Sequence, residues 1–147
     1  MAIKDISRKP YLQDEEDQIH IGIDLPFRRG TGSEGWFATT KITSEAIKND
    51  IRNFFNTKQG ERFFQPSIGT GIHKYLFEQG TTGVEDDIET DIRNLMGFWF
   101  PYVVINSIDT RFTLHGSEGR HKIQVSMIFT IQQDPGKLES LQLEFGE

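Results

Sequence analysis

The chain contains no cysteine, so neither disulfide bonds nor thiolate metal sites can contribute to its fold. It also lacks any apolar run close to the roughly 20 residues that a membrane-spanning helix needs. Its first ten residues mix Lys4, Asp5, Arg8 and Lys9 with few apolar side chains, unlike a secretory signal peptide. These absences predict a protein that folds in a reducing compartment and has no membrane partner.

Basic charge is also scarce. The chain has 16 Lys and Arg residues against 22 Asp and Glu residues, a formal net charge of −6. Because binding to phosphate backbones needs a basic face, we expect no nucleic-acid partner. What the chain does have is enough length for one core: 147 residues, 35% of them hydrophobic, with twelve phenylalanines. Its mean hydropathy is −0.49, which indicates a compact core.

The domain organisation is predicted to be simple. Residues 1–18 are polar and end in an acidic cluster, which is typical of a flexible N-terminal arm. Residues 19–147 are then expected to form a single domain. It opens on alternating apolar residues, namely Ile19, Ile21, Ile23, Leu25 and Phe27. A period of two over this length predicts a half-buried strand.

The segment 43–59 is predicted to be a helix, with Thr43 able to cap its start and Gly60 supplying a left-handed stop. Its apolar residues recur at helical spacing and form one stripe, namely Ile47, Ile51, Phe54 and Phe55. After this helix, residues 61–66 indicate a short extended piece. Residues 72–77 then indicate one short helical stretch.

A second long helix is predicted to begin with a capping box of Thr82 and Glu85 and to end before Pro101. Acidic residues follow its start on the outer side, where the helix dipole favours negative charge. One face is apolar and is formed by Val84, Ile88, Ile92, Leu95, Met96 and Trp99. This helix is therefore expected to pack against a core.

From Tyr102 onward the apolar spacing changes to a period of two, which predicts strands joined by turns at 115–120 and 134–136. The same-face sets are Val104, Ile108, Thr110, Phe112 and Leu114, then Ile123, Val125, Met127, Phe129 and Ile131, then Leu141, Leu143 and Phe145. The predicted class is α+β, with two main helices packed on a C-terminal three-stranded antiparallel β-meander and an N-terminal strand. A meander of this kind leaves a sheet edge open to another chain.

The residues that could carry chemistry form no complete site. His115 and His121 flank a predicted hairpin turn and could face each other, but no carboxylate pattern completes a metal site. The Gly-Thr-Gly of residues 69–71 is not followed by the Gly-Lys-Ser/Thr of a phosphate loop, so it indicates a turn. We therefore predict no catalytic, cofactor-binding or metal-ligating residue, and no cofactor.

Two carboxylates remain as candidates for glycoside hydrolysis, which needs a pair about 5–10 Å apart with one held in an apolar environment. Glu61 lies next to Phe63 in the sequence, and Glu78 follows Phe77. Nothing in their spacing requires the two to meet. The alternative is an ion pair of Glu61 with Arg62 or Lys74, and a solvated Glu78.

Residues 60–78 read Gly-Glu-Arg-Phe-Phe-Gln-Pro-Ser-Ile-Gly-Thr-Gly-Ile-His-Lys-Tyr-Leu-Phe-Glu. This stretch resembles the signature of the baseplate wedge, or sheath-initiator, family of contractile phage tails, which in T-even-type phages carries a lysozyme-like label. The matching positions are Gly60, Glu61, Arg62, Pro66, Gly69, Leu76, Phe77 and Glu78. The predicted order of elements also matches, so the resemblance extends over about residues 19–145.

The resemblance implies a structural protein of the virion tail baseplate, assembled in the host cytoplasm and present in six copies. Its partners would be the baseplate wedge core proteins and the first ring of tail sheath subunits. The last strand would accept a sheath strand by β-augmentation, with Leu138, Leu141, Leu143 and Phe145 as its sheath-binding residues. The wedge would be bound at Phe100, Pro101 and Tyr102, which replace a Glu-Pro-Arg triplet of the family. Contact there would be apolar and stacking instead of ionic.

Two other functions fit the sequence less well. A baseplate-borne muramidase would follow from the lysozyme-like label, with Glu61 and Glu78 as its carboxylates. A regulatory adaptor could use the same fold to bind one cellular protein. We therefore expect an assembly protein and not an enzyme.

Overall fold

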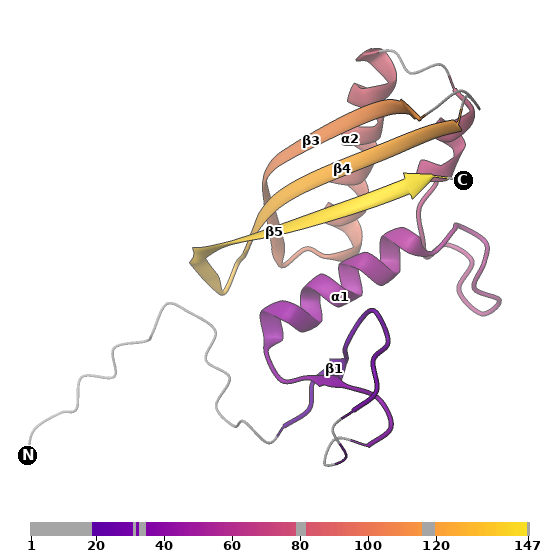
Figure 1. Cartoon of the computed structure of the whole chain (residues 1–147). Coiled ribbons are helices and arrows are strands. Elements are labelled where there is room, and N and C mark those ends of the chain that lie inside the picture. The colour runs from indigo at the N-terminus through magenta and orange to yellow at the C-terminus, as the bar shows by residue number, and fades with distance from the viewer. Residues whose placement is uncertain (1–18, 31, 33–34, 79–81, 116–119, 147) are drawn as a thin grey trace, which may run out of the picture.

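The computed structural model describes residues 19–30, 32, 35–78, 82–115 and 120–146, and Figure 1 shows their arrangement. The elements are, in order, β1 (Gly22–Ile23), β2 (Thr39–Thr40), α1 (Thr43–Asn56), the 3-10 helix η1 (Ile72–Phe77), α2 (Thr82–Trp99), β3 (Val103–His115), β4 (Arg120–Ile131) and β5 (Asp134–Gly146). The predicted α+β class is confirmed. The arm predicted over residues 1–18 lies outside the described residues.

Strands β3, β4 and β5 form one antiparallel sheet in that order, and the helices lie against one of its faces (Figure 1). On β4 the predicted inward set is buried throughout, from Ile123 to Ile131. Its partners on β5 include Leu141 opposite Met127 and Leu143 opposite Val125, and these side chains are buried too. The C-terminal meander therefore has an inner apolar face, as predicted.

Both long helices turn their predicted apolar sides towards this face. The stripe of α1 is buried, and Ile51 and Phe55 are fully so. On α2, Ile88, Ile92 and Met96 have no exposed surface. Because full burial of one such side chain stabilises a fold by about 1.5–3 kcal/mol, this seam between helices and sheet dominates the stability.

The first strand of the sheet departs from its predicted phase at Asn106. We predicted Val104 on the same face as Ile108, but Val103 is buried instead and Val104 is 48% exposed. The pairing with β4 shifts between Ile105 and Ser107, which marks a β-bulge at Asn106. A bulge adds one residue to one strand only, so it reverses which side chains face the core on one side of it.

The connection between β4 and β5 also differs from the prediction. The chain turns at residues 132–133, and Asp134 already pairs with Ile131. The next pair is Thr130 with Leu138, so residues 135–137 form an extra segment within β5. Pro135 and Gly136 thus belong to an irregular strand start and not to the turn itself. Proline and glycine suit such a place because the ladder is already interrupted there.

Helix α1 begins at Thr43 as predicted, but its predicted cap and its predicted end are wrong. The residue that caps α1 is Ile42, without a side-chain hydrogen bond, and Thr43 is already helical. The helix ends at Asn56, where the Thr57 hydroxyl donates to the Asn53 carbonyl at 2.7 Å. Gly60 does have a positive φ of 90°, but it serves the turn that follows. Helix α2 stops at Trp99, ahead of Pro101 as predicted.

The largest departure lies at the N-terminal end of the described chain. The half-buried strand predicted over residues 19–27 is reduced to the two residues of β1, which pair with β2. Its alternating side chains are exposed, with Ile21 at 46% and Ile23 at 50%. The two-stranded unit meets α1 through a polar contact, in which the Asn49 amide donates to the Thr40 hydroxyl at 3.3 Å. No second apolar layer among the described residues covers it.

Candidate functional site

The outer edge of β5 is open. This 13-residue strand pairs with β4 on one side. On its other side, no backbone group of the described residues hydrogen-bonds to it. An edge of this kind is a template on which another chain can add a strand.

The opposite edge of the sheet is met by a helix. Glu85 of α2 accepts a hydrogen bond from the Phe112 backbone N–H of β3, with 3.1 Å between Oε1 and N. This carboxylate was predicted to close a capping box with Thr82, whose side chain lies outside the described residues. The capping box therefore stays a prediction. Because Glu85 occupies a backbone donor of β3, the two edges of the sheet are not equivalent.

The same contact identifies which backbone groups of β5 point outward. Phe112 directs its N–H away from β4. In an antiparallel sheet, successive residues of a strand direct their backbone N–H and C=O groups alternately to one side of the strand and to the other. Ile123, the partner of Phe112, therefore bonds to β5, through Phe145. By the same alternation, the residues of β5 that direct their N–H and C=O groups to the free side are Ser140, Gln142 and Glu144. Their side chains lie on the outer face of the sheet.

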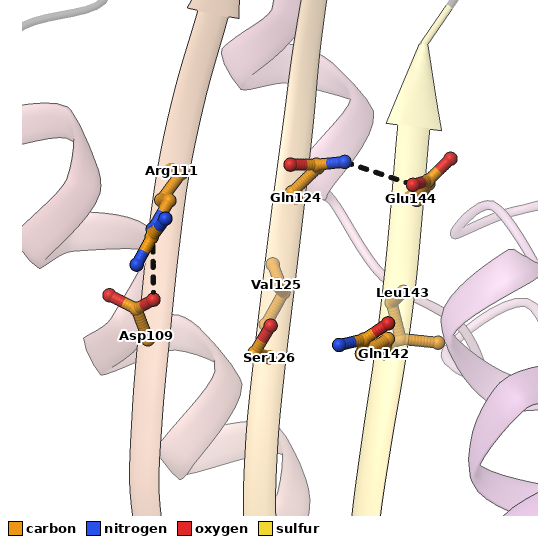
Figure 2. A pocket seen from close by; sticks show the side chains of 8 residues that line it. All are labelled: Asp109, Arg111, Gln124, Val125, Ser126, Gln142, Leu143 and Glu144. Atoms are coloured by element: carbon orange, nitrogen blue, oxygen red, sulfur yellow. Dashed lines mark hydrogen bonds and ion pairs between the residues drawn. The ribbon is translucent and has the colours of Figure 1, made fainter.

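That outer face is polar, and Figure 2 shows it from the side opposite the helices. Residues of the three strands line up in two rows, Asp109–Ser126–Gln142 and Arg111–Gln124–Glu144. The Arg111 Nε lies 3.0 Å from the Asp109 carboxylate along β3. The Gln124 amide donates to Glu144 across the strands at 2.9 Å. A strand added beside β5 would extend these rows.

Glu144 is the charged member of the rows on the edge strand. Lys122 donates to its Oε2 from 2.9 Å, and Gln124 donates to its other oxygen. The hydrogen bond from Lys122, followed by that from Gln124, lowers the pKa of Glu144 below its usual 4.5. The edge therefore presents an ionised carboxylate at neutral pH.

Ion pairs and a hydrogen bond connect the start of β5 to α1. Glu139 is buried on the inner face of the strand and forms ion pairs with Lys48 of α1 and with Lys137. Burial by itself would raise the pKa of Glu139, but the hydrogen bonds from Lys48 and Lys137 outweigh it and lower the pKa. Lys137 also reaches the Ser44 hydroxyl of α1 at 3.4 Å. These contacts fix the strand while its outer edge stays free.

The signature residues 60–69 form a loop of turns between α1 and η1, and not the extended piece that we predicted. The Gly60 N–H donates to the Pro66 carbonyl at 2.9 Å. Glu61 accepts the Lys58 backbone N–H at 3.0 Å, so the ion pairs considered for it are not formed among the described residues. Arg62 is exposed within the loop.

Gly69 closes this loop at a place that tolerates no side chain. Its φ is 111°, and a Cβ there would lie 2.5 Å from the Thr57 carbonyl oxygen. The close approach lets the Thr70 N–H donate to that carbonyl at 2.9 Å, and the Thr70 hydroxyl reaches the Phe55 carbonyl at 3.2 Å. The loop is therefore held against the end of α1 by these two hydrogen bonds.

The end of the signature divides between core and surface. Leu76 is buried, whereas Phe77 is 78% exposed and Glu78 is exposed. Between them and α2, the Tyr75 hydroxyl donates to Asp91 at 2.7 Å. That hydrogen bond, with burial, raises the pKa of Tyr75 to about 12. A tyrosine within the signature segment thus connects η1 to α2 through a hydrogen bond.

The predicted wedge-binding triplet is mostly a packing element. Phe100 is 8% exposed, and its ring meets Phe54 with centroids 5.4 Å apart. Pro101 is exposed, and Tyr102 is half-buried beside Phe100. Burial raises the pKa of Tyr102, with the negative charge of Asp50 adding to it. Wedge binding at these residues stays a prediction, with Pro101 and the edge of Tyr102 as the accessible parts.

The two candidate carboxylates of a muramidase are both exposed. Glu61 is engaged by the Lys58 N–H. Glu78 lines a shallow hollow together with Lys74, Tyr75 and Asp91. A general acid of a glycosidase is held in an apolar environment, whereas both of these carboxylates are exposed to solvent. The arrangement gives no geometric support for this chemistry.

The histidines form no site that the structure describes. The side chains of His115 and His121 lie outside the described residues, so their facing each other stays a prediction. Among the residues that are described, no three His, Asp or Glu side chains gather closely enough to hold a metal ion. Nor does any described helix have the length and apolar character needed to cross a membrane.

Sequence reasoning missed two surface features. Phe63 and Phe64 are 91% and 97% exposed at the tip of the signature loop. Their position between Gly60 and Pro66, outside any helical or strand period, was the available signal. The other feature is the Glu85 contact with β3, which has no signal in the sequence because its partners are 27 residues apart.

The comparisons with known proteins agree with this architecture. No individually curated protein sequence matches the chain. A solved structure described as a "putative tail lysozyme" from Geobacter sulfurreducens is 24% identical, with a TM-score of 0.61 over 71% of this chain and 91% of that one. A chain in the baseplate of the anti-feeding prophage is 19% identical, with a TM-score of 0.54 over 84% of this chain and 82% of that one. At these identities they establish a shared fold.

The sequence model of one protein family, Baseplate wedge protein gp25, matches residues 43–135. This segment runs from the first residue of α1 to the start of β5, and it contains the whole signature of residues 60–78. More than half of the 147 residues are matched. The chain therefore belongs to the family of Baseplate wedge protein gp25 and is a structural protein of a tail baseplate.

Proposed function

We propose that this baseplate protein initiates the tail sheath by accepting a strand from a subunit of the first sheath ring along the free edge of β5. The observation that carries the proposal is the open edge itself: on the outer side of β5, no backbone group of the described residues bonds to the strand. Backbone hydrogen bonds along such an edge supply affinity without any need for a pocket.

The choice of β5 over β3 rests on the asymmetry of the sheet. A strand added at β3 would have to displace Glu85 from the Phe112 N–H. At β5, the outward groups of Ser140, Gln142 and Glu144 need no such displacement. Leaving a buried or partly buried carboxylate without its donor costs free energy, which favours the unoccupied edge.

The predicted sheath-binding residues would act in two ways. Leu141, Leu143 and Phe145 are at most 5% exposed, so they hold β5 in place and cannot touch an incoming strand. Leu138 is 65% exposed and is available for contact. Register would come from the outer-face side chains, where ionised Glu144 favours a basic or amide side chain on the added strand.

The remaining partners follow from the same role. The protein would sit on the wedge core through its other end, in six copies around the hub, and would join the tail in the host cytoplasm. Residues 19–147 would act as one domain. Muramidase activity and a cellular adaptor role are the alternatives, and no contact among the described residues favours either of them.

The experiment uses a proline on the free edge. Gln142→Pro removes an outward N–H and leaves the bonds to β4 in place, because proline is tolerated on an edge strand whose N–H faces solvent. The variant should fold and enter baseplates, yet sheath should no longer assemble on them. Gln142→Ala keeps the N–H and is the matched control, expected to support normal sheath.

Electron micrographs of tails that carry each variant give the result. Normal sheath on Gln142→Pro baseplates would contradict the use of this edge. Deletion of residues 138–145 is not a suitable test, because it would also remove the three core side chains Leu141, Leu143 and Phe145.

A further inference from the structure

We propose that Phe63 and Phe64 form a docking tip that inserts into an apolar socket with carboxylates at its rim on another protein of the baseplate. The two residues lie in the loop between α1 and η1, far along the chain from the edge of β5. The proposal is therefore independent of strand addition. It concerns how the protein is held in the baseplate, not how the sheath begins.

The exposure of the two rings is the first argument. Phe63 is 91% exposed and Phe64 is 97% exposed, and their rings meet edge to face with centroids 5.4 Å apart. They pack on each other and cover none of the core. Aromatic side chains bury large areas at interfaces and are enriched at interface cores, so two adjacent exposed rings suit a binding tip.

The second argument is that the loop is preorganised. Gly60 donates to the Pro66 carbonyl at 2.9 Å, and Gln65 donates to the Arg62 carbonyl at 3.2 Å. At the base, Glu61 caps the Lys58 N–H, and Gly69 packs directly on the Thr57 carbonyl. A tip that is already ordered loses little conformational freedom on binding. In Figure 1 this loop projects from the end of α1, away from the body of the protein.

The third argument concerns charge, and it defines the partner. Arg62 is next to the two rings and forms no ion pair with any described residue, and neither does Lys58 at the base of the loop. The carboxylate in between, Glu61, is turned back to a backbone N–H. The tip is thus locally basic in a chain whose net charge is −6. A complementary socket is apolar inside and acidic at its rim.

A protein partner fits better than the alternatives. Membership of the baseplate wedge family places the chain among other baseplate proteins. A flat contact between two copies would set the cations of one tip against those of the other, which costs free energy. A lipid surface would bind the two aromatic rings, but such binding would not require the loop to be ordered and narrow.

The test replaces the rings in the full-length chain and measures its incorporation into baseplates assembled from the proteins encoded with it. Phe63→Ser with Phe64→Ser should lower incorporation at least about tenfold, as expected for the loss of two aromatic anchors. Trp36→Ser is the matched control, because Trp36 is 82% exposed on the connection between β1 and β2, outside the loop, and should leave incorporation unchanged. The midpoint of thermal unfolding should be the same for all three proteins, since the replaced rings cover no core.

Incorporation of the double variant at the wild-type level would overturn the proposal. Arg62→Glu should lower incorporation several-fold and Arg62→Lys should restore most of it, because only the charge is needed at the rim. Gln142→Pro should incorporate normally, which separates a failure at the tip from a failure at β5.

The partner is identified with a photo-crosslinking residue, p-benzoylphenylalanine, in place of Phe64 in the assembled baseplate. A crosslink to apolar residues of a different baseplate protein, with Asp or Glu nearby, is the expected result. A crosslink to a second copy of this chain would overturn the proposal. So would sedimentation of the wild-type protein, but not of the double variant, with vesicles of phosphatidylcholine and phosphatidylglycerol.

Discussion

Both sheets of this molecule are antiparallel and contain a segment of alternating apolar side chains, but among the described residues only the three-stranded sheet buries them. In the three-stranded sheet, Met127, Phe129 and Leu141 lie under the helices and are at most 1% exposed. In the two-stranded sheet, Ile21 and Ile23 keep about half of their surface exposed. Alternation decides which side chains share a face, whereas burial requires a second layer of structure.

The difference has an energetic consequence. A two-stranded sheet is marginally stable by itself, and this one meets α1 through polar contacts such as that of Asn49 with Thr40. We expect residues 19–42 to open locally at a much lower free energy than the core does. Four predictions test this contrast, from the largest expected effect to the smallest.

Phe129→Ala should have the largest effect. The ring is fully buried at the centre of β4, so its loss leaves a cavity between the sheet and the helices. We expect a decrease of about 3–5 kcal/mol in the free energy of unfolding. Urea denaturation followed by circular dichroism measures it, and a loss below about 1 kcal/mol would show that this face is not the main core.

Gly69→Ala should cost about 2–3 kcal/mol, because the backbone has a φ of 111° and a Cβ would meet the Thr57 carbonyl oxygen. The matched glycine is Gly22 in the two-stranded unit, where a Cβ would meet no atom within 4 Å. Gly22→Ala should change the free energy of unfolding by less than about 0.5 kcal/mol. Equal effects of the two substitutions would contradict the close contact of Gly69 with the end of α1.

Glu139→Gln should cost about 1–2 kcal/mol at neutral pH, since it removes the charge that pairs with Lys48 and Lys137. The pKa of Glu139 is lower in the folded protein than its usual 4.5, so its stabilisation is complete above that pH and is lost as the pH falls through the folded pKa. The variant should lack this part of the acid dependence. Denaturation between pH 3 and pH 7 compares the two proteins, and parallel curves would rule out the contribution.

Ile21→Ala should have the smallest effect, within about 0.5 kcal/mol, because the side chain already keeps 46% of its surface exposed in the folded protein. Hydrogen exchange adds a second measure, in which the amides of β1 and β2 should exchange faster than those of β4. A loss of 2 kcal/mol or more would mean that the two sheets belong to one cooperative core.

The helical faces and the meander could be predicted because their patterns are long and consistent. The stripe from Ile47 to Phe55 and the set from Ile123 to Ile131 each repeat over several turns or residue pairs, and each is buried as expected. Leu141, Leu143 and Phe145 were also placed on one face correctly. Their burial by helices and η1, which removes them from any docking surface, depends on long-range packing.

Other features depend on single residues or on distant neighbours. Asn106 makes a bulge, but nothing distinguishes it in sequence from an ordinary polar strand residue, so the phase of Val103 and Val104 was predicted wrongly. The exposure of Ile21 could not be predicted, because the missing second layer is a property of the whole fold. An open sheet edge was predicted from the meander, and the resemblance implied the last strand. The Glu85 contact that makes the two edges different could not be predicted.

The length of β5 has a mechanical consequence. Hydrogen bonds in an antiparallel pair run perpendicular to the strands, so a pull along a strand that is added beside β5 would load all of its bonds at once. A pull across the strand would break them one after another from the end. A sheath subunit attached along this 13-residue strand would therefore resist a pull along the strand better than a pull across it.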